Sequence, residues 1–209
     1  NQGLAWEGTL TTPPSTDNTS QQINGKLALD NVALSRADKP TKLVSLDHLE
    51  GRQITGDLVN FEIEQIGILG LTLTEADSSA LLTLEQLKLS KLHYSKEEGL
   101  GIANMAPHGL NQQLLRYPDG TWNINRLASQ LQALLPAANK ATPPSKPTML
   151  QIDSTTLGGE NQLQLTDQAT DPEFKLSLYP SQLELKGLGN RQSATLELAA
   201  RISERASLK

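Results

Sequence analysis

The chain has 209 residues, a formal net charge of −5 and no cysteine. Without cysteine it has no disulfide framework, no thiolate nucleophile and no cysteine-bearing zinc site. The mild acidity argues against nucleic-acid binding, which needs a basic surface to meet the phosphates. Hydrophobic residues form 37% of the sequence but aromatic residues only 3%, so leucine, isoleucine and alanine carry the apolar surface.

Apolar and polar residues alternate along most of the chain, which predicts strands with one apolar and one wet face. One example is the run Leu69, Leu71 and Leu73, and a last run over residues 194–202 also places its apolar residues on one face. Asn24-Gly25 is expected to form a turn before the first of the clear strands. The sequence therefore predicts a mainly β protein with an antiparallel sheet.

A short strand unit is repeated. Residues 27–35 (LALDNVALS) and 82–90 (LTLEQLKLS) align without a gap, and weaker copies begin at Val44 and Leu150. The unit, roughly L-x-L-[DE]-x-L-x-L, would send its two apolar pairs to opposite faces of a regular strand. An extra residue at a β-bulge would return both pairs to one face and bend the strand, so repeated units would curve the sheet into a U-shaped groove or half-barrel. The alternative is two short strands joined by a tight turn.

One segment has helical spacing. After an expected turn at Asp119-Gly120, a short amphipathic helix is predicted over residues 125–135, with Asn123 or Asn125 as its N-terminal cap and Pro136 as its stop. Its apolar positions are Ile124, Leu127, Leu131, Leu134 and Leu135.

The Pro-rich stretch 136–147 is predicted to be a linker or an exposed crossover. It divides the sequence into a β segment over residues 1–135, which ends in the helix, and a continuing β segment over residues 148–209. Both segments carry the strand unit, so the alternative is one continuous domain. No apolar run approaches the roughly 18 residues of a membrane helix, and we expect the chain to be a piece cut from a longer protein.

The sequence offers little catalytic chemistry. His48, His93 and His108 lack metal-binding spacing, and no G-x-S-x-G motif is present. Glu62 and Glu64 are expected on the wet face of a strand, and a glycosidase would need two facing carboxylates about 5–9.5 Å apart, of which the sequence gives no sign. We therefore expect no catalytic residues, no metal and no cofactor.

The apolar strand face is what remains as a candidate site. It either packs against a second layer as a closed core or stays open as a groove for acyl chains, for which aliphatic side chains offer a nonspecific lining. The predicted lining residues are Phe61, Ile63, Leu82, Leu84, Leu87, Leu89, Leu176, Leu178, Leu183 and Leu185.

Residues 114–135 (LLRYPDGTWNINRLASQLQALL) resemble an element of the AsmA/TamB-like envelope proteins, in which a D-G-x-[WL]-N-[IL]-x-x-L string follows a strand and leads into a short helix. The residues at those positions here are Asp119, Gly120, Trp122, Asn123, Ile124 and Leu127. The order of strands from Leu150 to Leu188 is similar to the uncharacterised branch of that superfamily. The polar stretches at residues 161–162 and 168–170 depart from it.

This resemblance implies a Gram-negative periplasmic protein whose parent chain is anchored in the inner membrane by a helix absent here. It implies curved sheets that form a hydrophobic groove, and a noncatalytic role in carrying phospholipids or other acyl-chain lipids between the two membranes. The alternative is a scaffold or interaction module that binds envelope proteins through its sheet edges.

Overall fold

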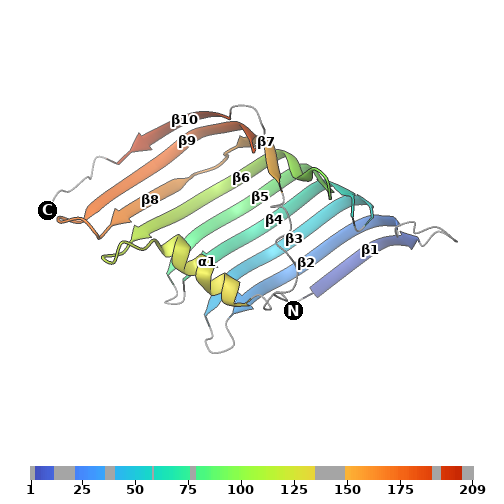
Figure 1. Cartoon of the computed structure of the whole chain (residues 1–209), viewed down its shortest axis with the longest axis horizontal. Coiled ribbons are helices and arrows are strands. Elements are labelled where there is room, and N and C mark those ends of the chain that lie inside the picture. Colours follow the sequence, from blue (N-terminus) through green and yellow to red (C-terminus); the bar gives the residue numbers. More distant parts are fainter. Residues whose placement is uncertain are drawn as a thin grey trace.

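The structure is a computed structural model of the whole chain, and it describes residues 3–11, 22–35, 41–57, 59–75, 79–134, 149–189 and 194–203. These residues form one curved β-sheet of ten strands and one helix (Figure 1). This confirms the predicted mainly β, curved fold. The elements are β1 (Gly3–Thr11), β2 (Gln22–Ser35), β3 (Lys42–Gly56), β4 (Phe61–Thr74), β5 (Ala80–Ser95), β6 (Gly99–Arg116), α1 (Asn123–Leu134), β7 (Leu150–Thr156), β8 (Gln162–Asp167), β9 (Phe174–Leu188) and β10 (Thr195–Ile202).

The strands cross the sheet in nearly sequential order. From β1 to β6 each strand is antiparallel to the next. β7 and β8 both pair with β6 and with β9, and β10 forms the second edge beside β9. The segments before and after the predicted crossover therefore contribute to one sheet. The crossover itself, residues 136–147, lies outside the described residues.

Two pairings differ from the antiparallel sheet that the sequence predicts, because β7 and β8 run parallel to β6. Parallel neighbours need a long connection, and the chain between β6 and β7 includes α1 and returns to the start of β6, where Leu150 lies opposite Leu100. β7 and β8 lie end to end along β6 as one interrupted strand, with the glycine pair Gly158-Gly159 between them.

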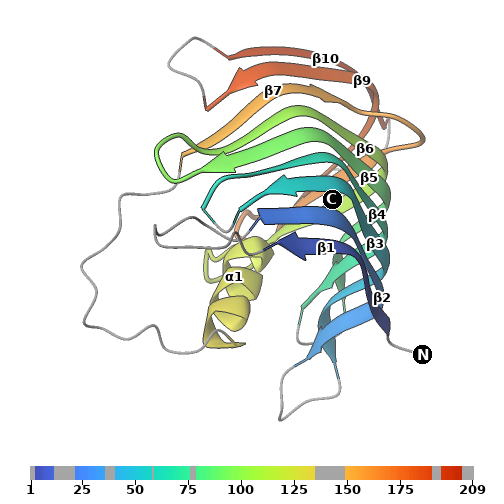
Figure 2. The same ribbon diagram turned by 90° about the vertical axis from the view of Figure 1, so that its right-hand side faces the viewer.

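The sheet bends strongly, and α1 lies inside the bend (Figure 2). A row of residues crosses the strands at the bend, and in it left-handed residues alternate with acidic residues from one strand to the next. Asn31 in β2, Gly70 in β4 and Gly109 in β6 have left-handed φ angles of 54°, 62° and 66°. The strand registers place Asp47 of β3 and Glu85 of β5 between them. We call this row the first bend line.

A second bend line crosses the sheet nearer the other strand ends. Gln53 in β3 and Lys91 in β5 both have a φ of 52°, and Glu64 of β4 lies between them in the register. Left-handed residues again occupy every second strand.

Each bend line shifts the alternation of side chains by one residue. Ile63 and Ile66 pack in the same apolar cluster although two residues separate them, and so do Leu89 and Leu92. The apolar residues of a strand therefore recur at spacings of two and three and stay on one face.

The parity shift predicted from the repeated unit is thus present, but its predicted cause was wrong. Neither copy of the unit, at residues 27–34 or 82–89, contains a shift of register at its centre. In the copy at residues 27–34 the left-handed Asn31 changes the alternation without an inserted residue, and the copy at residues 82–89 crosses the bend between the left-handed Gly70 and Gly109 of its neighbouring strands. Glycine and asparagine tolerate that conformation best.

Two further expectations are corrected. Leu69 does not share a face with Leu71 and Leu73, because the left-handed Gly70 lies between them. Asn24-Gly25 is inside β2 rather than in a turn. Gly25 pairs with a glycine of β1, and the ring of Trp6 lies where a β-carbon at Gly25 would be.

Helix α1 covers Asn123–Leu134, close to the predicted 125–135. The carbonyl of Trp122 accepts hydrogen bonds from the N–H groups of Asn125 and Arg126 at 3.1 and 3.2 Å. Trp122 is therefore the N-cap residue, and neither predicted cap takes that role. Oδ1 of Asn123 accepts a hydrogen bond of 2.9 Å from the adjacent N–H of Ile124. Nδ2 of Asn123 donates to the carbonyl of Gln113 in β6 at 2.7 Å and so ties the helix to the sheet.

Two β-bulges build the surface on which α1 lies. The registers of β2 with β3 and of β4 with β5 each skip one residue, Leu43 and Leu81 respectively. Both extra leucines pack with Leu127 of α1, and the three are 0%, 2% and 3% exposed. Leu73, Leu82 and Leu131 complete this cluster. A bulge places an additional side chain on one face, which here gives the helix a deeper apolar seat.

The bend lines predict the effect of two glycine substitutions in the same strand. In Gly70→Ala the new β-carbon would meet the carboxylate of Asp47, and the alanine would have to adopt a left-handed φ. We therefore expect a loss of about 1–2 kcal/mol or more in unfolding free energy. Gly67→Ala meets nothing within 4 Å and should be neutral or stabilising by up to about 1 kcal/mol. Urea unfolding of both variants checks this, and equal stability of the two would contradict the role of the bend line.

Candidate functional site: the apolar concave face

The candidate site is the face of the sheet on the inside of the bend. Residues directly opposite each other on neighbouring strands share a face, and five such rows are apolar. We call these rows the concave face. They are Val44, Leu73 and Leu82; Leu71, Leu84 and Leu110; Leu29, Leu49, Ile68, Leu87 and Pro107; Ile66, Leu89 and Met105; and Ile54, Ile63, Leu92, Ile102 and Ile152.

The structure brings the ten predicted lining residues to this one face. Five of them are members of the rows: Ile63, Leu82, Leu84, Leu87 and Leu89. Phe61 packs against the row that contains Leu92, Ile102 and Ile152. The four in β9 extend the face across the later strands. Leu176 and Leu178 lie opposite Leu165 and Leu163 of β8, and Leu183 and Leu185 lie opposite Leu198 and Leu196 of β10.

A single layer forms most of this surface. Leu92, Ile102 and Ile152 are buried by neighbouring side chains of the same curved sheet. Within the described ranges, α1 is the element that packs onto the concave face, and it covers the end where β3 and β5 begin. Between α1 and the other strand ends the apolar face has no second layer among those residues.

The apolar surface continues to both edges of the sheet. In β1, Leu4 lies opposite Leu29 and is 73% exposed. In β10, Leu196 and Leu198 are also exposed. In the part of the chain that the structure describes, the concave face is therefore open at its sides.

The convex face carries the charges. Nδ1 of His48 lies 2.6 Å from Oδ1 of Asp30, and Nδ1 of His108 lies 3.3 Å from Oε2 of Glu85. These two histidines thus pair with cross-strand carboxylates, and Arg52 pairs with Glu50 of its own strand at 2.8 Å. In the part of the chain that the structure describes, no group of three metal-binding side chains comes together.

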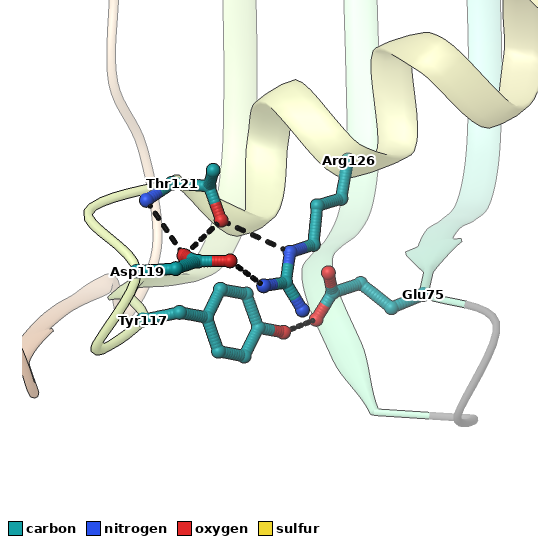
Figure 3. Close-up of polar contacts among 5 residues, drawn as sticks. All are labelled: Glu75, Tyr117, Asp119, Thr121 and Arg126. Carbon is teal, nitrogen blue, oxygen red and sulfur yellow. Dashed lines mark hydrogen bonds and ion pairs between the residues drawn. The ribbon is translucent and has the colours of Figure 1, made fainter.

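A polar network fixes the start of α1 (Figure 3). Asp119 accepts hydrogen bonds from the N–H and the hydroxyl of Thr121 at 2.9 and 2.6 Å. Nη2 of Arg126 donates to Asp119 at 2.8 Å, and its guanidinium lies 3.5 Å from the ring centre of Tyr117. The hydroxyl of Tyr117 donates to Glu75 at 2.6 Å. The network links the turn after β6, the first turn of α1 and the end of β4.

This network explains the electrostatics of the turn. The hydrogen bonds from Thr121, and after them the charge of Arg126, hold the pKa of Asp119 below its ordinary value. The motif residues therefore have structural roles: Asp119 and Gly120 shape the turn, Asn123 ties the helix to β6, and Leu127 anchors it.

Sequence reasoning missed the residues that seat α1. Leu43 and Leu81 each lie beside another apolar residue, Val44 and Leu82, and such apolar pairs at a strand start are the only signal for the bulges. Glu75, which is 5% exposed and accepts the hydrogen bond from Tyr117, carries no local pattern at all.

No family model, curated protein or solved structure matches this chain. Among the helical residues that the structure describes, none belongs to a segment long and apolar enough to span a bilayer.

The lowered pKa of Asp119 predicts a pH-dependent contribution to stability. Because the folded state favours the carboxylate, the contribution is present above the unfolded-state pKa of about 3.9 and is lost as the pH falls through the folded-state value. Asp119→Asn should therefore lower the urea midpoint at neutral pH but not at about pH 2, below the ordinary carboxyl range. Glu97→Gln, in an exposed turn, is the control. A loss that persists unchanged in acid would contradict the electrostatic explanation.

Proposed function

We propose that this chain is a noncatalytic segment of a periplasmic envelope protein whose concave face binds the acyl chains of phospholipids. The observation that supports it most is the continuous aliphatic surface on the inside of the bend, which has no second layer between α1 and the far strand ends in the described residues. The resemblance of residues 119–127 to the AsmA/TamB-like proteins supports the same proposal and suggests transport between the inner and outer membranes.

The chemistry of the face suits acyl chains. Each methylene removed from water contributes about 0.8 kcal/mol, and leucine and isoleucine side chains impose no directional contacts. A chain that moves by one methylene along such a surface exchanges equivalent contacts, so the barrier to sliding is low. A groove of this kind therefore favours conduction of a lipid as well as its binding.

Helix α1 defines one end of the proposed lipid site. Leu127 and Leu131 occupy the apolar surface around Leu43 and Leu81, so an acyl chain cannot lie there while the helix is seated. Lipid would therefore occupy the rows from Leu84 toward Ile63 and enter from the edges or from the end opposite α1.

A second candidate is a protein-interaction module. Every described side chain of β10 is exposed, and the outer side of β10 has no neighbouring strand in the described sheet. Such an edge can accept a strand of a partner protein by β-augmentation.

The proposal predicts that two leucines on neighbouring strands behave differently. Leu87 lies on the concave face, whereas Leu69 is 40% exposed and lines a hollow of the convex face with His48 and Arg52. With p-benzoylphenylalanine at Leu87, irradiation in the presence of phosphatidylethanolamine and phosphatidylglycerol vesicles should yield a lipid adduct. The same residue at Leu69 should yield little, and mass spectrometry of the protein measures both.

Copurified lipid gives an independent measurement. Leu87→Asp should reduce the phospholipid extracted from the purified protein several-fold, while Leu69→Asp should leave it unchanged. Two results would contradict the lipid proposal. One is equal lipid labelling at Leu87 and Leu69, and the other is wild-type protein free of lipid together with no labelling at Leu87. Capture of a partner protein that is lost with proline in β10 but kept in Leu87→Asp would favour the interaction module.

A further inference from the structure

A hollow lies on the convex face, and its lining also includes Ile63 and Leu92 of the concave rows. Its volume is about 550 Å³, and β2, β3, β4 and β5 each contribute to its lining. A second hollow of about 310 Å³ shares Thr55, Glu62 and His93 with it. This second hollow reaches Phe61 and Tyr94, whose rings stack with centres 5.4 Å apart. The two together form an elongated depression with a mixed polar and apolar lining and the aromatic pair at one end.

The backbone at the hollow is strained at two of its polar residues. Gln53 and Lys91 line it and both have a left-handed φ of 52°. The other left-handed residues that the structure describes are glycines and Asn31, which adopt this conformation at the least cost. The bend line needs the left-handed backbone, but it does not need a glutamine or a lysine there. Retained strain of this kind is a mark of functional positions.

Most polar side chains around the two hollows are exposed and have no partner among the described residues, although Ser95 Oγ accepts a hydrogen bond of 3.0 Å from the N–H of Glu98. Gln53, Glu62, Glu64 and Lys91 take part in none of the hydrogen bonds or ion pairs of that part of the structure. By contrast, Arg52, next to Gln53 in β3, is fully engaged with Glu50. His93 lies against Gly101 of β6, in the space that a larger residue there would fill. The hollow thus presents a fixed imidazole and several unpaired donors and acceptors.

We propose that this hollow binds an oligosaccharide. Each sugar hydroxyl both donates and accepts hydrogen bonds, which matches a lining that mixes amides, carboxylates, an ammonium group and a hydroxyl. The half-buried Phe61 and Tyr94 rings line the second hollow and offer an aromatic surface on which the apolar face of a sugar ring can pack. Two adjoining hollows give room for more than one sugar unit. The presence of both signs of charge makes the lining a poor match for a simple anion or cation. The site lies mainly on the convex face and shares Ile63 and Phe61 with the proposed lipid surface, but it does not depend on lipid binding.

The strained residues make the test specific. The purified chain is titrated with chitobiose, cellobiose, maltose and glucosamine, with binding followed by NMR chemical shifts. At least one of the three disaccharides should bind and shift the amide signals of residues 53–55 and 91–94. Gln53→Gly and Lys91→Gly should each weaken that binding about tenfold or more, because each removes a hydrogen-bonding side chain.

The same variants should be at least as stable as the wild type, because glycine relieves the left-handed strain. A loss of binding that accompanies higher stability cannot come from misfolding. Lys88→Gly is the control: it lies in β5 on the convex face outside both hollows and lacks a left-handed φ, so it should lower stability and leave saccharide binding unchanged.

Several outcomes would overturn the inference. No shift with any of the three disaccharides would do so, and so would binding that both glycine variants retain. Binding of inorganic phosphate or calcium at the same residues, without saccharide binding, would show an ion site instead. None of these results would bear on lipid labelling at Leu87.

Discussion

The architecture depends on one backbone constraint: a strand that bends twice must still keep its apolar side chains on the inside. Regular alternation cannot satisfy this over the length of β4 or β5, because each bend changes which residues face inward. At each bend line, left-handed residues on alternate strands keep the apolar side chains on the inner face of the sheet. Asn31, Gly70 and Gly109 form one line with Asp47 and Glu85 between them. Without these positions the concave face would break into polar and apolar bands.

The same constraint explains how a single-layer sheet holds together. Strong curvature brings side chains of neighbouring rows closer on the inside, so that Leu92 and Ile102 are buried without a covering layer among the described residues. At one end, where a flatter surface must receive α1, bulges at Leu43 and Leu81 add side chains instead. The chain thus uses left-handed residues to preserve a face and inserted residues to thicken it, and the two coincide at Gln53, where the register of β2 with β3 also shifts.

The repeated unit was readable from the sequence because its spacing of two and three is a one-dimensional pattern. The lining residues from Phe61 to Leu185 follow from that pattern and share a face. The cause of the shift in side-chain alternation could not be predicted, since the sequence does not distinguish a left-handed glutamine or lysine from any other polar residue. Leu69 was misplaced for the same reason. The parallel pairing of β7 and the burial of Glu75 depend on contacts between distant segments, which no local pattern encodes.

The scarcity of aromatic residues also follows from the bend lines. A curved face packed row against row has room for branched aliphatic side chains but little for rings within it. The rings lie at the margins instead: Trp6 on the edge strand over Gly25, Phe61 against Tyr94 beside a turn, and Tyr117 beneath Arg126 at the start of α1. Because the pair at the turn borders both faces, it lies at the end of the proposed lipid surface and at the end of the proposed saccharide hollow.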